Sequence, residues 1–106
     1  MKIEDWNIEE MTGYEPKTTF YTDFSIADAY GEWAIKDTYK RAMEAWKTDT
    51  VFLTELVMVL NWKMWRWYEH NDAYALLYSD LWEKSVKYAT SHLHGEDLMY
   101  YYRTTD

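Results

Sequence analysis

Two histidines near the C-terminus are the nearest approach to a metal site in this sequence. His92 and His94 are followed by Glu96 and Asp97, and imidazole and carboxylate groups are common metal ligands. On a helix, residues two apart point about 200° away from each other, so both rings could bind one ion only where the helix has ended. The chain contains no Glu-x-x-His or His-Glu-x-x-His pattern. We therefore predict no metal site and no cofactor.

The residue patterns of nucleophilic catalysis are absent as well. The chain has no cysteine, which excludes a thiolate nucleophile, a thiolate metal site and a disulfide scaffold. It contains no Gly-x-Ser-x-Gly elbow and no glycine-rich phosphate loop, and it has three glycines in all. Adjacent carboxylates such as Glu9 and Glu10 are typical of a solvated surface. We predict no catalytic residues and a protein that is not an enzyme.

Aromatic side chains are unusually frequent and point to a binding surface. Seven Trp, eleven Tyr and three Phe make up 20% of the 106 residues. Buried at about 200 Å² each, these rings would claim about a third of all the surface that a chain of this size buries on folding. Because Trp is rarely buried completely, some rings should contact another protein or a second copy in a homodimer. The tryptophans expected at this interface are Trp6, Trp33, Trp62, Trp65 and Trp82.

Residues 62–68 alternate rings and cations in the order Trp-Lys-Met-Trp-Arg-Trp-Tyr. This composition is also found in patches that stack on bases or lie on membranes. On a helix, however, Trp62 and Trp65 share one face, whereas Trp67 lies on another face, one turn from Lys63. The spacing therefore favours a core or subunit interface with a cation–π pair at its rim.

A basic stripe on the second predicted helix is an alternative functional surface. Its members are Lys36, Lys40, Arg41 and Lys47. The whole chain carries 19 acidic and 11 basic side chains, a net charge of -8, which opposes binding to phosphate backbones. The acidic excess lies mainly in residues 1–15 and 71–106. Nucleic-acid binding therefore remains an alternative only through this local stripe.

The elements that must position these residues are helices, because apolar residues recur every three or four positions from residue 22 onward. Ser25 and Asp28 form a weak capping-box pattern for a first helix over 23–30. Gly31 either kinks one long helix or separates two, and we favour two helices that meet there. No segment alternates with the period of a strand.

Cap residues predict three more helices. The run Thr48, Asp49 and Thr50 starts a third helix, whose apolar residues on nearly every side predict a central position. Asn71 with Asp72 starts a fourth helix, which ends at Gly95, and Glu96 with Asp97 starts a last short one.

We therefore predict an all-α fold, a compact antiparallel helical bundle of about three long and two short helices. Residues 1–19 show no sustained period and form an extended N-terminal arm, and residues 20–106 form a single domain. The longest apolar run, Leu56 to Leu60, is too short to span a bilayer, and the first residues lack the apolar core of a signal peptide. We expect a cytoplasmic protein without a membrane segment.

Several helix faces and caps resemble those of a known group of proteins. Residues 22–31, 34–42, 53–61 and 102–106 are similar to small uncharacterised helical proteins of bacteriophages and mobile elements of Gram-positive bacteria. The resemblance covers residues 17–106 and leaves the arm unmatched. It implies such an origin and a compact helical fold, but no activity and no functional residue.

The leading hypothesis is a non-enzymatic interaction protein of phage or mobile-element origin that binds another protein in the host cytoplasm. The aromatic surplus, the missing catalytic pattern and the resemblance all favour it. A host defence nuclease is one candidate target, because a small acidic protein suits that role.

Overall fold

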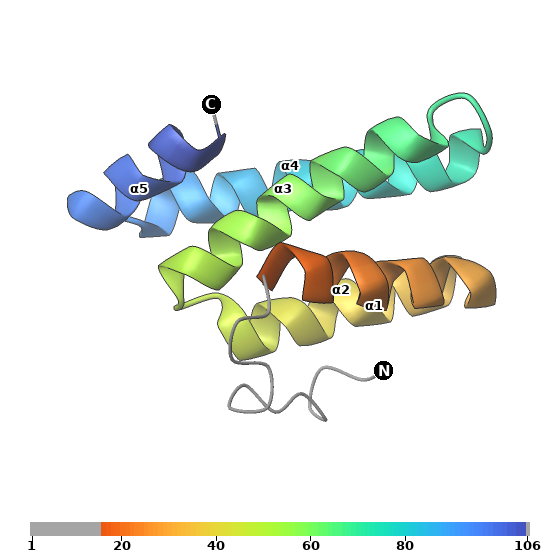
Figure 1. The fold of residues 1–106 in the computed structure, drawn as a ribbon, viewed down its shortest axis with the longest axis horizontal. Helices are drawn as coiled ribbons and strands as arrows, with labels where there is room; N and C mark the ends of the chain where they lie inside the picture. The colour runs from red at the N-terminus through yellow and green to blue at the C-terminus, as the bar shows by residue number, and fades with distance from the viewer. Residues whose placement is uncertain (1–15, 106) are drawn as a thin grey trace.

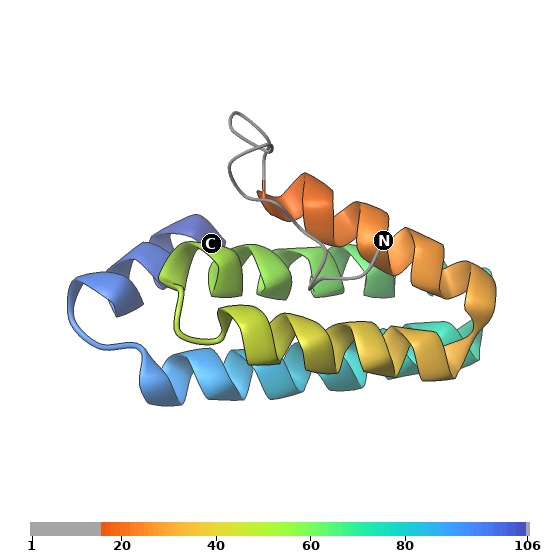
Figure 2. The same cartoon turned by 90° about the horizontal axis from the view of Figure 1, so that it is seen from below.

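Four short links divide residues 16–105, the part of the chain that the computed structural model describes, into five helices (Figure 1). The helices are α1 (Pro16–Tyr30), α2 (Glu32–Trp46), α3 (Thr50–Trp67), α4 (Asp72–His92) and α5 (Glu96–Thr105). Successive helices run in opposite directions along the molecule (Figures 1 and 2). No strand occurs among the described residues. The predicted all-α helical bundle is confirmed.

Gly31 separates α1 from α2. Its φ of 119° lies in a region that residues with a side chain rarely adopt, so the chain can turn here at little cost. The N–H of Gly31 donates to the carbonyl of Ala27 (3.1 Å), and its own carbonyl accepts from the N–H groups of Ala34 and Ile35. The prediction of two helices that meet at Gly31 is confirmed.

The first helix begins earlier than the sequence predicts, at Pro16. A proline suits the first position of a helix because it has no N–H to leave unsatisfied. Residues 16–19, assigned to the arm, are therefore helical, whereas residues 1–15, including Trp6, lie outside the described residues. Ser25 and Asp28 lie within α1, not at its start, so the predicted capping box is wrong.

Two predicted caps are confirmed by hydrogen bonds. The Asp49 carboxylate accepts from the N–H of Phe52 (3.0 Å) at the start of α3. The Asn71 side-chain oxygen accepts from the N–H of Tyr74 (3.1 Å) at the start of α4. Each bond satisfies one of the N–H groups that a helix leaves unpaired in its first turn.

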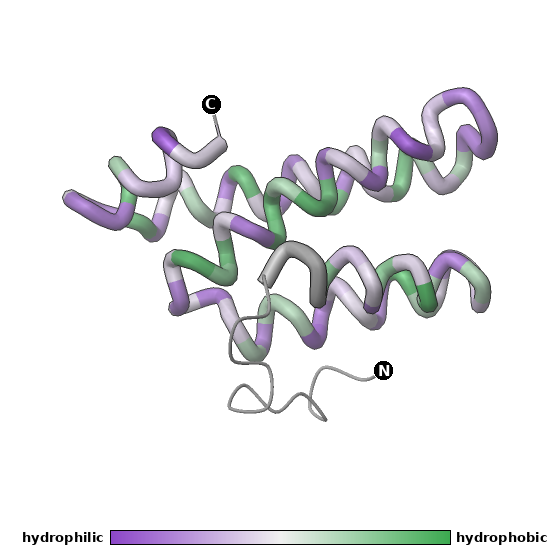
Figure 3. The backbone as a smooth tube through the Cα atoms, viewed as in Figure 1, coloured by the Kyte–Doolittle hydropathy of each residue, from purple (hydrophilic) through white to green (hydrophobic). Residues whose placement is uncertain are grey.

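Helix α3 lies at the centre and packs against all four other helices. The main core forms where α1–α4 meet, and it includes Phe24 and Tyr78, whose rings pack edge to face with centroids 5.8 Å apart. A second, smaller core forms where α5 covers α3 and α4. Apolar and polar residues alternate along the coloured parts of the helices in Figure 3, as expected for helices with one buried face.

A buried ion pair joins α1 to α3. Lys63 is only 1% exposed, and its ammonium contacts the Asp28 carboxylate (Nζ–Oδ2, 2.5 Å) and donates to the hydroxyl of Ser25 (3.2 Å). The same carboxylate accepts from the indole N–H of Trp67 (3.1 Å) and from the hydroxyl of Tyr78 (2.5 Å). Both charges are therefore compensated by opposite charge and by hydrogen bonds.

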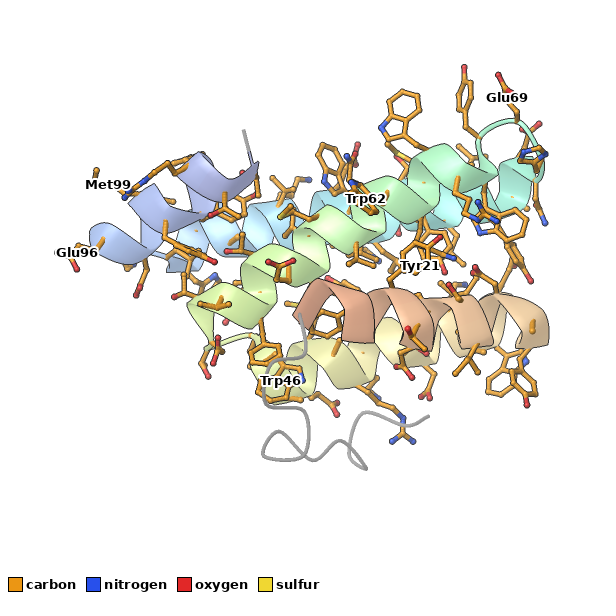
Figure 4. All side chains as sticks on the ribbon, viewed as in Figure 1. Tyr21, Trp46, Trp62, Glu69, Glu96 and Met99 are labelled. Carbon is orange, nitrogen blue, oxygen red and sulfur yellow. The ribbon has the colours of Figure 1, made fainter. Side chains whose placement is uncertain are left out.

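Aromatic rings close the surroundings of this pair. The Lys63 ammonium lies 4.9 Å from the centroid of the Tyr21 ring, which Figure 4 places between α1 and α3. It also lies 6.0 Å from the Trp67 ring, so the predicted cation–π pair forms, but in the interior and not at a rim. Burial, with the bond to Asp28, raises the pKa of the Tyr78 hydroxyl, which therefore remains a donor.

Removal of one partner of this ion pair should therefore destabilise the fold strongly. Lys63→Met leaves the Asp28 charge buried without its cation, so the free energy of unfolding should fall by about 3–5 kcal/mol. Adding Asp28→Asn to this variant should recover part of the loss, because the unpaired charge is removed. Urea denaturation followed by circular dichroism measures both. Lys84→Met, which breaks the exposed pair with Asp80 (3.2 Å), is the control and should change the free energy by less than about 1 kcal/mol.

A second buried carboxylate makes stability depend on pH. Burial raises the pKa of Asp23 from 3.8 to about 6, because the charged form loses its hydration. The folded state thus binds this proton more tightly than the unfolded state, and the Asp23 contribution to stability falls as the pH rises from about 4 through 6.

Asp23→Asn should therefore be more stable than the wild type above about pH 7, and the difference should shrink towards pH 4. Urea unfolding of both proteins across this range tests the sign, because the other titrating groups are common to both. A difference that is constant with pH would contradict the shift.

Candidate functional site

The last turns of α3 and the residue after it expose three aromatic side chains. Trp62, Trp65 and Tyr68 are 56%, 61% and 60% exposed. They follow one another at intervals of three residues, so they lie along one side of the helix. The ring centroids of Trp65 and Tyr68 are 5.6 Å apart, and Trp62 lies on the side of α3 away from α1 (Figure 4). We call these three residues the aromatic face.

The buried ion pair explains why these rings face outward. Lys63 and Trp67, one turn apart on α3, both bind Asp28 of α1. Trp62 and Trp65 lie on other sides of the same helix and are exposed. The prediction that Trp67 lies on a different face from these two rings is confirmed.

A hollow of about 310 Å³ adjoins the aromatic face between α3 and α4. It is lined by Met64, Tyr68, Asp72, Ala75, Leu76 and Ser79. The small side chains of Ala75 and Ser79 leave room between the larger ones, and Leu76 is 71% exposed. Single exposed leucines are common, but Leu76 lines this hollow together with Tyr68 of the aromatic face, and adjoining exposed apolar side chains mark interaction sites.

The five tryptophans predicted at an interface therefore do not form one surface. Trp62 and Trp65 are brought together on the aromatic face. Trp33 is also exposed but lies on α2. Trp82 is half-buried and packs against both cores, while Trp6 lies outside the described residues. Tyr68 and Leu76 are exposed residues of the site that the sequence did not predict. For Tyr68, only its spacing of three residues from Trp65 could have indicated a place on the same surface.

The basic residues of the alternative surface are interrupted by acids. The four predicted residues lie on α2 or directly after it: Lys36, Lys40, Arg41 and Lys47. Arg41 Nε donates to the Asp37 carboxylate at 2.9 Å. Glu44 is exposed one turn after Lys40, between it and Lys47. The local positive charge is thus reduced along the whole stripe.

The two histidines have separate surroundings. The ring of His92 stacks on that of Tyr88 with centroids 4.0 Å apart, and its Nδ1 lies 2.9 Å from the Tyr88 carbonyl oxygen. His94 is exposed in the link between α4 and α5. Within residues 16–105, no group of three or more His, Asp or Glu side chains is placed to hold a metal ion. No helix in the described part is long and apolar enough to cross a membrane.

A further hollow of about 470 Å³ lies beside the ion pair and includes Asp28, Lys63 and Arg66 in its lining. A buried lysine is a candidate nucleophile when its amine is available. Here the Lys63 ammonium is held by Asp28 and Ser25. This lysine therefore stabilises the packing of α1 on α3.

No protein-family model, curated protein or solved structure matches this chain. The aromatic face and the neighbouring hollow are therefore the features of the molecule that bear on its function.

Trp62, Trp65 and Trp82 should respond differently to truncation. Trp62→Ala and Trp65→Ala should each change the free energy of unfolding by less than about 0.5 kcal/mol, because their rings contact little of the core. Trp82→Ala should lower it by about 3 kcal/mol, because this ring packs against both cores. Urea unfolding followed by circular dichroism, which does not depend on tryptophan emission, measures all three. A large loss with Trp65→Ala would show that this ring supports the fold.

Proposed function

We propose that this chain is a non-enzymatic interaction protein that binds another protein through its aromatic face. The observation that carries the proposal is that Trp62, Trp65 and Tyr68 lie along one side of α3 with more than half of each side chain exposed. Trp and Tyr are enriched in protein interfaces and dominate their binding energy. The buried ion pair holds α3, so the rings would be oriented before binding, which lowers the entropy lost on association.

Charge favours a different protein over a second copy as the partner. With a net charge of -8, two copies of this chain repel each other, whereas a basic partner is attracted. A phage or mobile-element origin, as expected from the sequence, would make a host protein the partner. A host defence nuclease fits both points, since a nuclease carries a basic surface for phosphates.

The nucleic-acid alternative has weaker support. Asp37 and Glu44 lie among the basic residues of α2, and Arg41 is bonded to Asp37. Neither duplex nor single-stranded DNA should therefore cause a mobility shift, even at low salt.

A pull-down from nuclease-treated bacterial lysate, read by mass spectrometry, tests the proposed function. The wild type should capture a stoichiometric protein, and Trp62→Ser with Trp65→Ser should lower the captured amount at least about tenfold, because exposed aromatic anchors often contribute about 2 kcal/mol each. Tyr102→Ser, which removes a half-exposed ring from α5, is the matched control and should retain the partner.

Capture that is unchanged in the double variant would contradict the proposal. Trp33→Ser tests the other exposed tryptophan separately, and we expect it to retain the partner because Trp33 lies on α2, away from the aromatic face. Light scattering of the purified protein measures whether a homodimer forms instead.

A further inference from the structure

We propose that the groove between α3 and α4 binds a short amphipathic helix of the partner, with apolar side chains on one face and basic side chains at its flanks. This inference rests on the proposed function, since it assigns the partner a binding site and a chemical class. Amphipathic helices are a recurrent ligand of apolar grooves, and they are held by anchors at positions i, i+3, i+4 and i+7.

The protein already places a helix of its own in this groove. Helix α5 packs against α3 and α4, and residues of all three helices enclose a hollow of about 190 Å³. Its lining includes Val57 and Asn61 of α3, Trp82 and Val86 of α4, and Thr105 at the end of α5. One end of the α3–α4 groove is thus a helix-binding surface within the fold.

The same groove continues beyond α5 as the hollow beside the aromatic face. Along α3 and the residue after it, the lining runs from Val57 and Asn61, next to α5, to Met64 and Tyr68 in the open part. The steps are four, three and four residues. On α4 it runs in the opposite direction by the same steps: Val86, Trp82, Ser79 and Ala75. Such steps keep residues on one helix face, so the two hollows belong to one groove.

The position of α5 leaves the second half of this groove uncovered. Figures 1 and 2 show α5 beside the first half of α3, running in the same direction as α3. The distance along α3 from Asn61 to Tyr68 is about 10 Å at 1.5 Å per residue. This length accommodates about two turns of a helix, which is enough for anchors at i, i+3, i+4 and i+7.

The charges that flank the open half are acidic. Asp72 lines it, and Glu83 is exposed one turn beyond Ser79 on α4. Glu69, next to Tyr68 in the chain, is exposed in the link that follows α3 (Figure 4). The basic residues of this part of α3, Lys63 and Arg66, line the hollow beside α1 instead. A helix with basic flanks is therefore complementary to the groove, whereas an acidic one is repelled.

Binding of synthetic peptides to the full chain tests this inference. The probe is a fluorescent 14-residue helical peptide with leucines on one face and lysines on both flanks. One comparison peptide has the same composition in a scrambled order, and another carries glutamate in place of lysine. Fluorescence anisotropy should give a dissociation constant at least about tenfold lower for the probe than for either comparison peptide. Equal binding of the scrambled peptide, or no binding of the probe at about 1 mM, overturns the proposal.

Variants of the groove locate the binding. Leu76→Ser with Ser79→Lys removes one wall and fills the open half, and it should weaken probe binding at least about tenfold. Glu69→Lys with Glu83→Lys should do the same through charge while leaving the groove open. The matched control is Met99→Ser with Tyr102→Ser on α5, where Met99 lies at the opposite end from Glu69 (Figure 4). This control should bind the probe within about twofold of the wild type; unchanged binding by both groove variants overturns the proposal.

The lysate pull-down separates this inference from the proposed function. If Trp62→Ser with Trp65→Ser loses the partner and Leu76→Ser with Ser79→Lys keeps it, the proposed function stands and the groove proposal is wrong. If both variants keep the partner, both proposals are wrong. If both lose it and the groove variant also loses the probe, both are supported.

Discussion

The burial of one positive charge, Lys63, constrains the arrangement of the whole bundle. An ammonium group is costly to remove from water unless an opposite charge and hydrogen-bond acceptors replace its hydration. Asp28 and Ser25 of α1 provide these groups. If the packing register of α3 shifted by one residue, the Lys63 side chain would turn by about 100°, away from its partners. The ion pair therefore fixes which face of the central helix packs on α1 and which face remains outside.

This constraint divides the abundant aromatic residues into two groups with different roles. One group surrounds Asp28. The side chains of Trp67 and Tyr78 donate to the Asp28 carboxylate, and the hydroxyl of Tyr74 donates to the Asp28 backbone carbonyl (3.0 Å). Rings with a polar tip can serve there because they fill apolar volume and still supply a hydrogen bond. The other group forms the aromatic face, where Trp62 and Trp65 contact little of the fold.

Local chemistry predicted the helix boundaries better than the site. Asp49, Asn71 and Gly31 act on backbone groups within a few residues, so their roles could be inferred from the sequence. Ser25 and Asp28 have the same local pattern as a cap, yet they bind Lys63 from another helix, and no local pattern encodes that contact. The exposure of Trp65 and the half-burial of Trp82 likewise depend on which helices cover them, a property of the tertiary packing.

The stabilising and exposed residues of α3 lie on different faces of one helix, and this separation bears on how the protein could bind. Changes at Trp62 or Trp65 leave the contacts of Lys63 intact, so an interface there can vary without loss of the fold. A helix held by a buried ion pair also loses little conformational entropy when a partner docks on its outer face. Helix α5 already packs in the α3–α4 groove, and it covers only the first half of that groove. The remaining half has acidic residues at its flanks and apolar residues in its lining. A basic amphipathic helix can therefore be attracted by the charges and held by its apolar side chains.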